Sequence, residues 1–424
     1  MNIDRGAEIF DKLKSKGLII ENNIDLDCCI EDYRSTNLNL FTDVGLHIVV
    51  LTNECNLRCK YCQTNNKERD YMSKEVANKV LEIMYSQRIP NLTLEFQGGE
   101  PLLNWDTLRY FVEYTRKYNM TGRNIRLVLV SNFSLLDNKK MKFLIDNDVN
   151  LCTSLDGPKT IHDKNRPSLD GISSYDKAVF WVDKIKKEYK KRKKKNKSCG
   201  MLPTISRHSL PFYKEIVDEY VKFGQVSIAI RPVNKLGLAT ASWEEIGYTY
   251  KEFIDFWKKS LNYILELNKR GVFIYERMAY VMLRKILKKE DPGYVDLCSP
   301  CGAGRSVLSY SPEGDVYTCD EARMIGEKLF KMGNVLHDTP SEIFESPVLM
   351  QTCQASLLNI WDEASAYSTW GGTCPVLNYV EQGSPVVKLS ESSFYRIQTA
   401  QLEFLFSKIA EDGEDLEIFK KWVR

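Results

Sequence analysis

The chain has 424 residues, too many for one ordinary hydrophobic core, so we expect a barrel-sized catalytic domain and a smaller module. Its formal net charge of +2 indicates no general attraction to polyanions, and nucleic acid is not an expected partner. Because no apolar run reaches the roughly 18 to 20 residues that span a bilayer, and the first residues lack the order of a signal peptide, we expect a cytoplasmic protein with no membrane partner.

Residues 1–44 are interpreted as an N-terminal extension, with a predicted helix at 7–16 and a predicted strand at 18–21. Residues 45–240 then alternate between short β-branched runs and longer amphipathic stretches, which is typical of βα units around a parallel sheet. The predicted strands are 46–51, 92–96, 125–131, 149–154, 200–205 and 226–231. The predicted helices, several of which begin with a capping Ser, Asn or Asp, are 73–87, 104–118, 138–147, 174–190 and 210–223. Six such units predict an α/β fold with a partial (β/α)6 TIM-like barrel, in which chemistry gathers at the carboxyl ends of the strands.

The rest of the chain changes character twice. Residues 241–295 are helical in pattern and rich in aromatic residues, and we interpret them as a bridge whose rings pack in a core. Residues 296–385 are rich in loops and carry five cysteines, and residues 386–424 predict a closing amphipathic helix. The basic run from Lys184 to Lys197 is interpreted as a solvated helix end, with a patch for an anionic partner as the alternative.

The twelve cysteines indicate metal ligation or redox chemistry rather than a disulfide framework, because a reducing compartment is expected. Cys55, Cys59 and Cys62 follow the first predicted strand, so one loop presents three thiolates at the mouth of the barrel. Three thiolates can hold three irons of a cubane and leave the fourth iron open to a small molecule. Zinc is the main alternative, but its common structural sites pair two C-x2-C units, and no fourth Cys or His is near in sequence. The cysteines outside the two groups, interpreted as buried thiols, are Cys28, Cys29, Cys152 and Cys199.

The C-x3-C-x2-C loop, with Tyr61 before its last cysteine, resembles the signature of the radical S-adenosylmethionine (SAM) superfamily. The resemblance implies a [4Fe–4S] cluster on these three cysteines that cleaves SAM reductively, with Tyr61 against the adenine. The resulting 5′-deoxyadenosyl radical would abstract hydrogen from the substrate. Gly98-Gly99-Glu100 after the second strand resembles the family's GGE motif. By that resemblance the glycines let the ligand approach the backbone, and the Glu100 carboxylate receives the SAM amine.

Polar residues after the third and fourth strands extend the resemblance. Ser131 and Asn132 are similar to the family's ribose and methionyl contacts. The segment from Ser154 through Asp156 to Arg166 resembles the one that follows strand four in peptide-modifying members. Arg166 is therefore a candidate to pair with the SAM carboxylate, and a surface arginine is the alternative. Arg231, which ends the sixth predicted strand, is a further candidate for a polar contact.

The spacing of Cys301, Gly314 and Cys319 resembles the opening of the SPASM domain, the auxiliary-cluster module of radical SAM peptide maturases. The family continues with C-x2-C-x5-C-x3-C, whereas here Ser356 follows Cys353 where a cysteine is expected. Most ligands of a second auxiliary cluster are therefore missing. The resemblance implies one auxiliary [4Fe–4S] cluster held by Cys301, Cys319 and Cys374, with Cys353 or Cys298 as the fourth ligand.

Asp320 directly follows Cys319. In the sulfatase-maturing relatives an Asp at that position acts as the base, so the resemblance makes Asp320 a candidate general base. The alternative is a solvated carboxylate in a hairpin.

The blocks 204–211 and 319–324 are most similar to maturases of ribosomally made (RiPP) peptides, of the His-Xaa-Ser-system or cyclophane-forming type. This resemblance, which covers residues 45–383, implies a precursor peptide as substrate and a carbon–carbon (cyclophane) or thioether crosslink as product. It also implies an electron donor such as flavodoxin or ferredoxin. Residues 1–44 are too few for a winged-helix recognition domain, so a separate peptide-recognition protein, or leader contacts made by the barrel, is implied. The alternatives are formylglycine formation in a sulfatase and a non-catalytic iron–sulfur redox or peptide-binding scaffold.

Overall fold

The computed structural model describes residues 43–64, 68–119, 122–194, 197–288, 290, 293–298, 300–358 and 372–424. The helix and strand expected within residues 1–44, together with Cys28 and Cys29, lie outside the described residues. The chain from Asp43 to Arg424 forms one compact unit. Among the helices described, none combines the length and the apolar sequence that a bilayer crossing requires.

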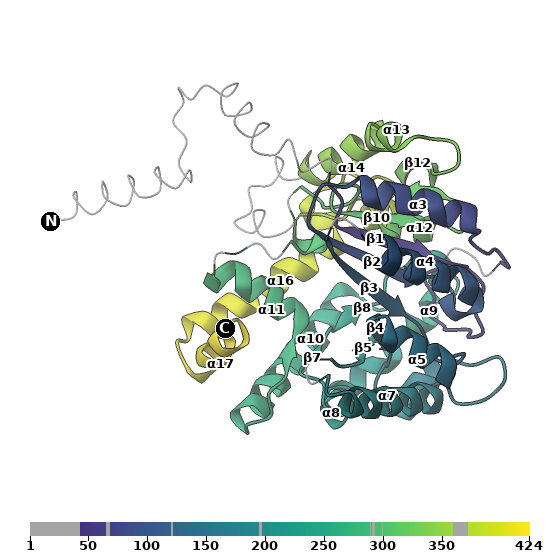
Figure 1. The fold of residues 1–424 in the computed structure, drawn as a ribbon. Helices are drawn as coiled ribbons and strands as arrows, with labels where there is room; N and C mark the ends of the chain where they lie inside the picture. The colour runs from purple at the N-terminus through teal and green to yellow at the C-terminus, as the bar shows by residue number, and fades with distance from the viewer. Residues whose placement is uncertain are drawn as a thin grey trace, which may run out of the picture. The chain divides into compact units, whose positions relative to one another are not determined.

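An eight-stranded, mainly parallel sheet organises the described residues, in the order β12-β11-β10-β1-β2-β3-β4-β5 (Figure 1). Its parallel strands are β1 Leu46–Val50, β2 Asn91–Gln97, β3 Asn124–Val130, β4 Asn150–Ser154, β5 Gly200–Leu202 and β10 Val307–Tyr310. Two antiparallel strands, β11 Asp315–Tyr317 and β12 Lys331–Asn334, extend it beyond β10. The expected α/β fold is therefore confirmed. The C-terminal region adds three strands directly to the sheet of the barrel.

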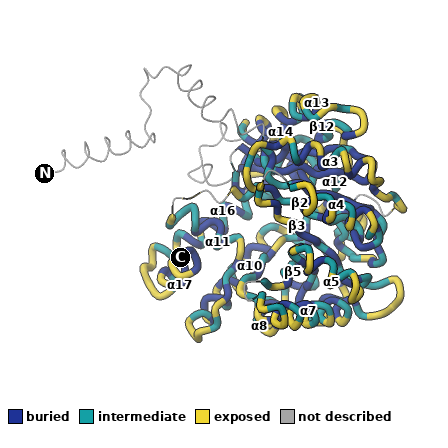
Figure 2. Tube along the Cα trace, viewed as in Figure 1, coloured by how far each residue is buried: buried dark blue, intermediate teal, exposed yellow. Residues whose placement is uncertain are grey.

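Helices cover the outer face of this sheet, as the alternation along the strands requires. On β2, Leu92, Leu94 and Phe96 are buried, and the alternate residues point to the opposite face. The covering helices are α3 Lys74–Ser86, α4 Trp105–Tyr118, α5 Asn138–Asp146, α7 Ser174–Lys191 and α8 Tyr213–Lys222. Ser73, Asp137 and Ser173 cap α3, α5 and α7 through their side chains. Figure 2 shows the helices exposed on their outer side and buried where they meet the strands.

The last two predicted barrel strands are interrupted. The run 200–205 divides at Pro203 into β5 and β6 (Thr204–Ile205), because proline has no N–H to continue the ladder. The run 226–231 becomes β7 (Ser227–Ile228) and β8 (Arg231–Pro232). These short strands leave the large sheet, since β6 pairs with β8 and β7 pairs with β9 (Tyr275–Glu276). A continuous sixth strand was thus wrong, and these residues form two small parallel pairs apart from the large sheet.

The bridge contains the helices α9 Trp243–Ile246, α10 Tyr250–Lys269 and α11 Arg277–Leu283, followed by a π-helical turn at Arg284–Lys288. Its aromatic residues form a core as expected, because Phe253, Phe256 and Trp257 are buried. Short helices surround the last strands: α12 Asp320–Ile325, α13 Pro340–Phe344, α14 Pro347–Leu358 and α15 Pro375–Gln382.

The single closing helix expected at the C-terminus is two helices. They are α16 Ser393–Ala410 and α17 Glu414–Trp422. Asp412 has a φ of 47°, which ends the first helix before Gly413 begins the second. Both helices contact α10, where the ring of Phe404 meets Trp257 at a centroid distance of 6.1 Å.

The remaining short elements connect this framework. They are η2 Pro101–Asn104, α6 Lys159–Asn165, η3 Arg207–Phe212, η4 Gly237–Thr240, η6 Val295–Leu297, η7 Lys328–Phe330 and η8 Leu389–Glu391.

The basic run at the end of α7 is paired with acidic residues of the neighbouring segment. Arg192 forms ion pairs with Asp146 and Glu188, and Lys194 and Lys197 each lie 3.2 Å from Asp148. These contacts use part of the charge that an anionic partner would need.

Candidate active site

The cysteine loop begins where β1 ends and is held in place by its backbone on both sides. Arg58 N donates to Pro167 O at 2.8 Å, and Lys60 N donates to Asn165 O at 2.9 Å. The Arg58 guanidinium returns to the loop and donates to Cys55 O at 2.7 Å. A loop whose backbone N–H groups are already bonded to the neighbouring segment keeps its thiols in a fixed direction.

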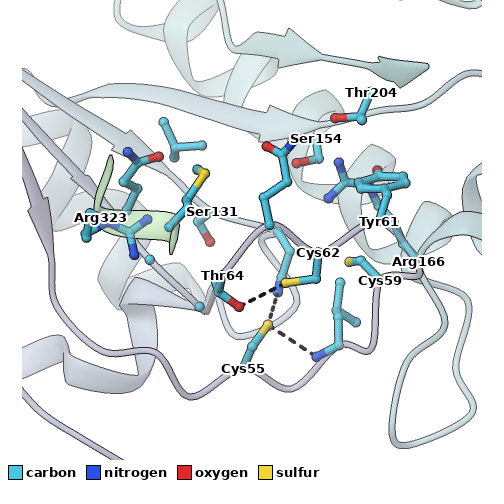
Figure 3. Close-up of a pocket in the computed structure, with 18 residues that line it drawn as sticks. Cys55, Cys59, Tyr61, Cys62, Thr64, Ser131, Ser154, Arg166, Thr204 and Arg323 are labelled. Carbon is cyan, nitrogen blue, oxygen red and sulfur yellow. Dashed lines mark hydrogen bonds between the residues drawn. The ribbon is translucent and has the colours of Figure 1, made fainter. Parts of the chain in front are cut away.

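All three cysteines of this loop line one pocket at the carboxyl ends of β1 to β4. The pocket has a volume of about 800 Å³, which includes the part that is open to solvent. Figure 3 shows the cysteines between Arg323 on one side and Tyr61 with Arg166 on the other. The predicted residues that line it are Cys55, Cys59, Tyr61, Cys62, Gly98, Gly99, Ser131, Asn132, Ser154 and Arg166. These predicted residues therefore share one pocket, and their contacts with SAM stay a prediction.

Polar groups reach the sulfur atoms of the loop. Leu57 N donates to Cys55 Sγ at 3.4 Å, and Asn132 Nδ2 lies 3.9 Å from the same sulfur. Cys62 Sγ lies 3.2 Å from Thr64 Oγ1. The thiolate is the form of cysteine that binds metal, and it can accept hydrogen bonds from neighbouring donors. Three thiols around one open cavity are a donor set that fits a cubane cluster with one unliganded iron.

Within the part of the chain that the structure describes, no group of three or more His, Cys, Asp or Glu side chains lies close enough to hold a single metal ion. A cubane places each thiolate on a different iron, so its ligands do not converge on one point.

The GGE turn packs against the cysteine loop more tightly than any side chain would allow. A Cβ on Gly99 would lie 2.2 Å from Glu54 O, and a Cβ on Gly98, whose φ is +133°, would lie 2.5 Å from Thr52 O. Gly99 N and Glu100 N donate to Thr52 O and Glu54 O, both at 2.8 Å. The glycines thus fix the pocket floor, in addition to the ligand approach expected from the sequence.

Glu100 does not line the pocket and is fully buried behind it. Its carboxylate accepts Ser131 Oγ–H at 2.7 Å, Asn132 N–H at 2.9 Å and Leu102 N–H at 3.0 Å. Burial raises the pKa of this carboxyl, and the three donors oppose the rise. Glu100 therefore holds Ser131 and Asn132 at the pocket wall, and its contact with a SAM amine stays a prediction.

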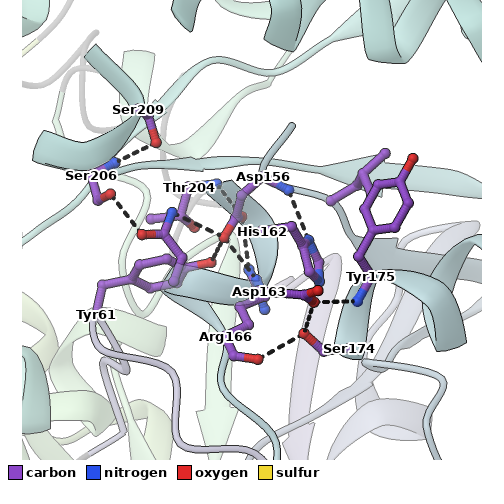
Figure 4. Close-up of polar contacts among 12 residues, drawn as sticks. Tyr61, Asp156, His162, Asp163, Arg166, Ser174, Tyr175, Thr204, Ser206 and Ser209 are labelled. Carbon is purple, nitrogen blue, oxygen red and sulfur yellow. Dashed lines mark hydrogen bonds and ion pairs between the residues drawn. The ribbon is translucent and has the colours of Figure 1, made fainter. Parts of the chain in front are cut away.

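Asp156 is also fully buried, at the centre of a polar network (Figure 4). Arg166 donates to it through Nε at 3.0 Å and Nη2 at 3.2 Å, and Thr204 N donates at 3.1 Å. Tyr61 O–H also donates to Asp156, and its ring lies 5.0 Å from the Arg166 guanidinium. Burial alone would raise the pKa of Asp156, but Arg166 and His162 hold it below its ordinary value.

The alternative interpretation of Arg166 as a surface arginine was wrong. Its side chain is 11% exposed and lines the pocket while it pairs with Asp156. The predicted contact with a SAM carboxylate stays a prediction.

The cysteines of the C-terminal region gather in an apolar environment. Cys319 belongs to a buried cluster around Ile48 and Val307, and Cys301 and Cys374 pack against that cluster. Cys353 Sγ lies 3.8 Å from Cys301 O. Cys298 Sγ lies 3.3 Å from Tyr294 O, four residues earlier in the chain. The structure thus brings the three predicted auxiliary ligands together, with Cys353 beside them.

Asp320 is held by three donors and is not a solvated hairpin carboxylate. It begins α12, and its side chain is 13% exposed. Arg323 Nε and Gln97 Nε2 each donate to it at 2.8 Å, and Ser309 Oγ donates at 3.2 Å. Gln97 and Arg323 themselves line the pocket, although Asp320 does not.

Sequence reasoning did not identify Gln97, Thr204, Arg323 and Met324 as pocket residues. Gln97 directly precedes the GGE turn, and its polar side chain at the end of a buried strand was a usable signal. Arg323 lies one helical turn after Asp320, but the approach of α12 to the pocket depends on the pairing of β10 with β1. That pairing had no local signal.

Comparison with known proteins agrees with this geometry. Residues 49–202 match the model of the Radical SAM superfamily. The cysteine-type anaerobic sulfatase-maturating enzyme of Clostridium perfringens is 27% identical over 315 residues, which cover 72% of this chain and 80% of that enzyme. The structure of native anSMEcpe with bound AdoMet and Cp18Cys peptide superposes with a TM-score of 0.70 at 20% identity, covering 87% of this chain and 98% of that one. Streptococcus suis SuiB bound to precursor peptide SuiA superposes with a TM-score of 0.59 at 14% identity, covering 91% and 88%. The two structural likenesses concern the fold.

Proposed function

We propose that this chain, a radical SAM enzyme homologous to the anaerobic sulfatase-maturating enzymes, modifies a side chain of a ribosomally made precursor peptide. The observation that carries the proposal is the single pocket onto which the three cysteines of one loop and the polar ends of β2, β3 and β4 converge. A pocket with three thiols and a buried polar wall is suited to a cluster with one open iron. It is not suited to a purely structural metal, which needs a closed ligand set.

The cofactors of the family are a [4Fe–4S] cluster and SAM. In this chain Cys55, Cys59 and Cys62 would hold the cluster, and the pocket beside them would hold SAM. When bound, these groups supply a 5′-deoxyadenosyl radical that abstracts a hydrogen atom from the substrate.

The protein's own residues would orient the ligand. Glu100 fixes Ser131 and Asn132 as donors on one wall. On the other wall Asp156 fixes Tyr61 and Arg166, so the ring and the guanidinium keep their places without a ligand. Side chains held before binding lose less conformational entropy when SAM arrives.

Asp320 is our candidate for the group that takes the substrate proton. Its carboxylate accepts hydrogen bonds from Gln97 and Arg323, which both line the pocket. These two donors hold the carboxylate between the C-terminal region and the barrel. A positioned carboxylate of this kind typically contributes about 10²- to 10⁴-fold to a proton-transfer step.

The bond that we propose is a crosslink. Loss of a β-carbon hydrogen, followed by attack on a neighbouring side chain and loss of a second hydrogen, gives a carbon–carbon or thioether bond. An auxiliary cluster on Cys301, Cys319 and Cys374 would accept the second electron. The incomplete cysteine pattern of the C-terminal region supports a role separate from that of the sulfatase-maturating relatives. We further propose flavodoxin or ferredoxin as electron donor and a separate peptide-recognition protein.

Formylglycine formation in a sulfatase is the second candidate function. It is favoured by the 27% identity with the Clostridium perfringens enzyme over 72% of this chain. Asp320 is compatible with both candidates, because both reactions need a base beside the pocket.

The test is anaerobic incubation of the reconstituted enzyme with SAM, dithionite and the precursor peptide encoded nearest to the gene. Tandem mass spectrometry should show that the peptide has lost two hydrogens. The loss should map to two residues whose fragments stay linked to each other. A product that reacts with a hydrazide reagent contains an aldehyde and identifies formylglycine. Unchanged peptide without 5′-deoxyadenosine would contradict both candidates.

A further inference from the structure

Two arginines line the pocket that contains the cysteine loop, and each is paired with a carboxylate behind the pocket wall. Arg166 pairs with Asp156, and Arg323 pairs with Asp320. Neither of these two carboxylates lines the pocket itself. Figure 3 shows the two arginines on opposite sides of the cysteines, with Tyr61 beside Arg166. An arginine that is held from behind therefore stands on each of two facing walls.

The two arginines use their N–H donors differently. Arg166 donates to Asp156 through both Nε and Nη2, at 3.0 and 3.2 Å. Arg323 donates to Asp320 through Nε at 2.8 Å, and within the described residues its two Nη nitrogens form no hydrogen bond. The side chain of Arg323 is only 4% exposed, and it lines the pocket. This buried guanidinium therefore keeps two nitrogens available to a ligand in the pocket.

The large sheet holds Arg323 in position. Its partner Asp320 also accepts Gln97 Nε2 from β2 at 2.8 Å and Ser309 Oγ from β10 at 3.2 Å. The backbone of Arg323 is fixed as well, because its N–H donates to Cys319 O at 3.2 Å in the first turn of α12. A side chain that is already held in this way loses little conformational entropy when it binds a ligand.

The pairing with Asp320 favours a neutral acceptor at the Nη nitrogens over an anion. Arg323 and Asp320 are 2.8 Å apart, so the pair as a whole carries no net charge. A ligand carboxylate at the Nη nitrogens would lie close to the carboxylate of Asp320, and like charges repel. A carbonyl oxygen accepts the same N–H groups without that repulsion. The expected ligand group is therefore a carbonyl.

We propose that the Nη nitrogens of Arg323 bind a main-chain carbonyl oxygen of the substrate peptide, on the wall of the pocket that faces Arg166. This inference rests on the proposed peptide substrate. Every residue of a peptide offers a main-chain carbonyl, so the contact holds the peptide whatever its side chains are. Arg323 lies one helical turn after Asp320 and is paired with it, so the contact also brings the main chain to the proposed base.

The test measures the fluorescence anisotropy of labelled probes with the reconstituted, SAM-bound enzyme in the absence of a reductant. The first probe is fluorescein-labelled hexaalanine with an amidated C-terminus. The second is the matching amidated hexamer of lactic acid, in which esters replace the amides and the carbonyls are weaker acceptors. The third is labelled hexaalanine with a free C-terminus. Because these probes repeat one unit, the result does not depend on which residue meets Arg323.

We expect the wild type to bind hexaalanine amide about tenfold more tightly than the lactic acid hexamer, as one hydrogen bond to a charged group implies. Arg323→Gln should reduce this preference to about twofold, because a neutral amide replaces the guanidinium. Arg323→Lys keeps the charge but not the fork, so it should retain a preference of about threefold. The Lys variant also keeps the test valid should the Gln variant fail to fold.

Arg109→Gln is the matched control, because Arg109 is an exposed arginine on α4, and it should bind all three probes like the wild type. Circular dichroism establishes that each variant is folded. The contact is overturned if the wild type does not bind hexaalanine amide, or if the preference survives unchanged in the Arg323 variants. Binding of the free C-terminus about tenfold more tightly than the amide would assign Arg323 to a carboxylate instead. A tenfold loss of SAM affinity in Arg323→Gln, with the peptide preference unchanged, would assign it to SAM.

This outcome is separable from the fate of the proposed function, because the binding assay needs no turnover. A preference for the amide that depends on Arg323, without any 5′-deoxyadenosine when dithionite is added, would leave the contact standing and remove the radical maturase. Turnover of SAM and precursor by an enzyme that binds the amide and ester hexamers equally would do the reverse.

Discussion

The two groups of cysteines are held by different means. Cys55, Cys59 and Cys62 lie within eight residues, and their loop faces a pocket that opens to solvent. Cys319 and Cys374 are far apart in sequence and meet in an apolar cluster that includes residues of β1 and β10. The first group has room for a small molecule beside it, and the second packs against apolar side chains.

This difference separates two roles. An open site beside polar walls is suited to binding and cleaving SAM, whereas a site packed among apolar side chains is suited to accepting an electron. We therefore expect the first group to be required for all chemistry and the second only for completing the product.

The largest effect is expected from Cys55→Ala. Loss of one of three thiolates leaves the open-iron cluster without its ligand set, so formation of 5′-deoxyadenosine should fall to the rate without enzyme. Chromatography of the nucleoside products measures this. Cys199→Ala is the matched control, because Cys199 is a buried thiol outside both groups, and it should keep iron and activity. A Cys55 variant that still cleaves SAM would disprove the assignment.

The next effect is expected from Cys319→Ala. The reconstituted wild type should contain about eight irons per chain and this variant about four, because one auxiliary cluster is lost. SAM cleavage should persist while the crosslinked product falls. Iron analysis combined with product mass spectrometry measures both. A wild type with about four or about twelve irons would show that the number of auxiliary clusters is wrong.

A smaller effect is expected from Asp320→Asn. Asp320 connects the two regions through its hydrogen bond with Gln97. Loss of a positioned base should slow peptide modification by about 100-fold while 5′-deoxyadenosine still forms. Arg323→Gln should slow it less, by about tenfold, because Asp320 keeps its other donors. The ratio of product to 5′-deoxyadenosine measures the effect. Glu313→Gln, exposed in the β10–β11 turn, is the control, and an unchanged ratio in Asp320→Asn would exclude it as the base.

The sequence predicted the first region far better than the second. The strands β1 to β4 and their helices follow local hydrophobic periods, and the cysteine loop follows a short spacing, so neighbouring residues carry the signal. The prediction of the run 200–205 as one strand was wrong because Pro203 interrupts the ladder, and residues 204–205 pair with another strand.

The arrangement of the C-terminal region depends on contacts between distant residues. The parallel pairing of β10 with β1 brings α12 to the pocket. The sequence around Arg323 contains no pattern that predicts this contact. For the same reason Arg166 was open to interpretation as a surface residue until the structure placed it on buried Asp156. Tertiary pairing decided both cases.

The last prediction compares an ion pair from each region. Asp156→Asn leaves Arg166 without its buried partner, so the free energy of unfolding should fall by about 3 to 5 kcal/mol. Asp315→Asn breaks the ion pair with Lys331. The side chain of Asp315 is 23% exposed and that of Lys331 is 33% exposed. Because solvent screens this pair, its loss should lower the free energy of unfolding by at most about 1 kcal/mol. Urea unfolding of both variants at pH 7 measures the difference.

Lowering the pH should reduce the destabilisation caused by Asp156→Asn. The pKa of Asp156 is lowered in the folded state, so its contribution to stability is present above the unfolded pKa of about 4 and is lost as the pH falls through the folded pKa. The difference in unfolding free energy between wild type and Asp156→Asn should therefore shrink from pH 7 to pH 3.5. A difference that stays constant over this range would show that Asp156 stabilises the wall by packing alone and not by its charge.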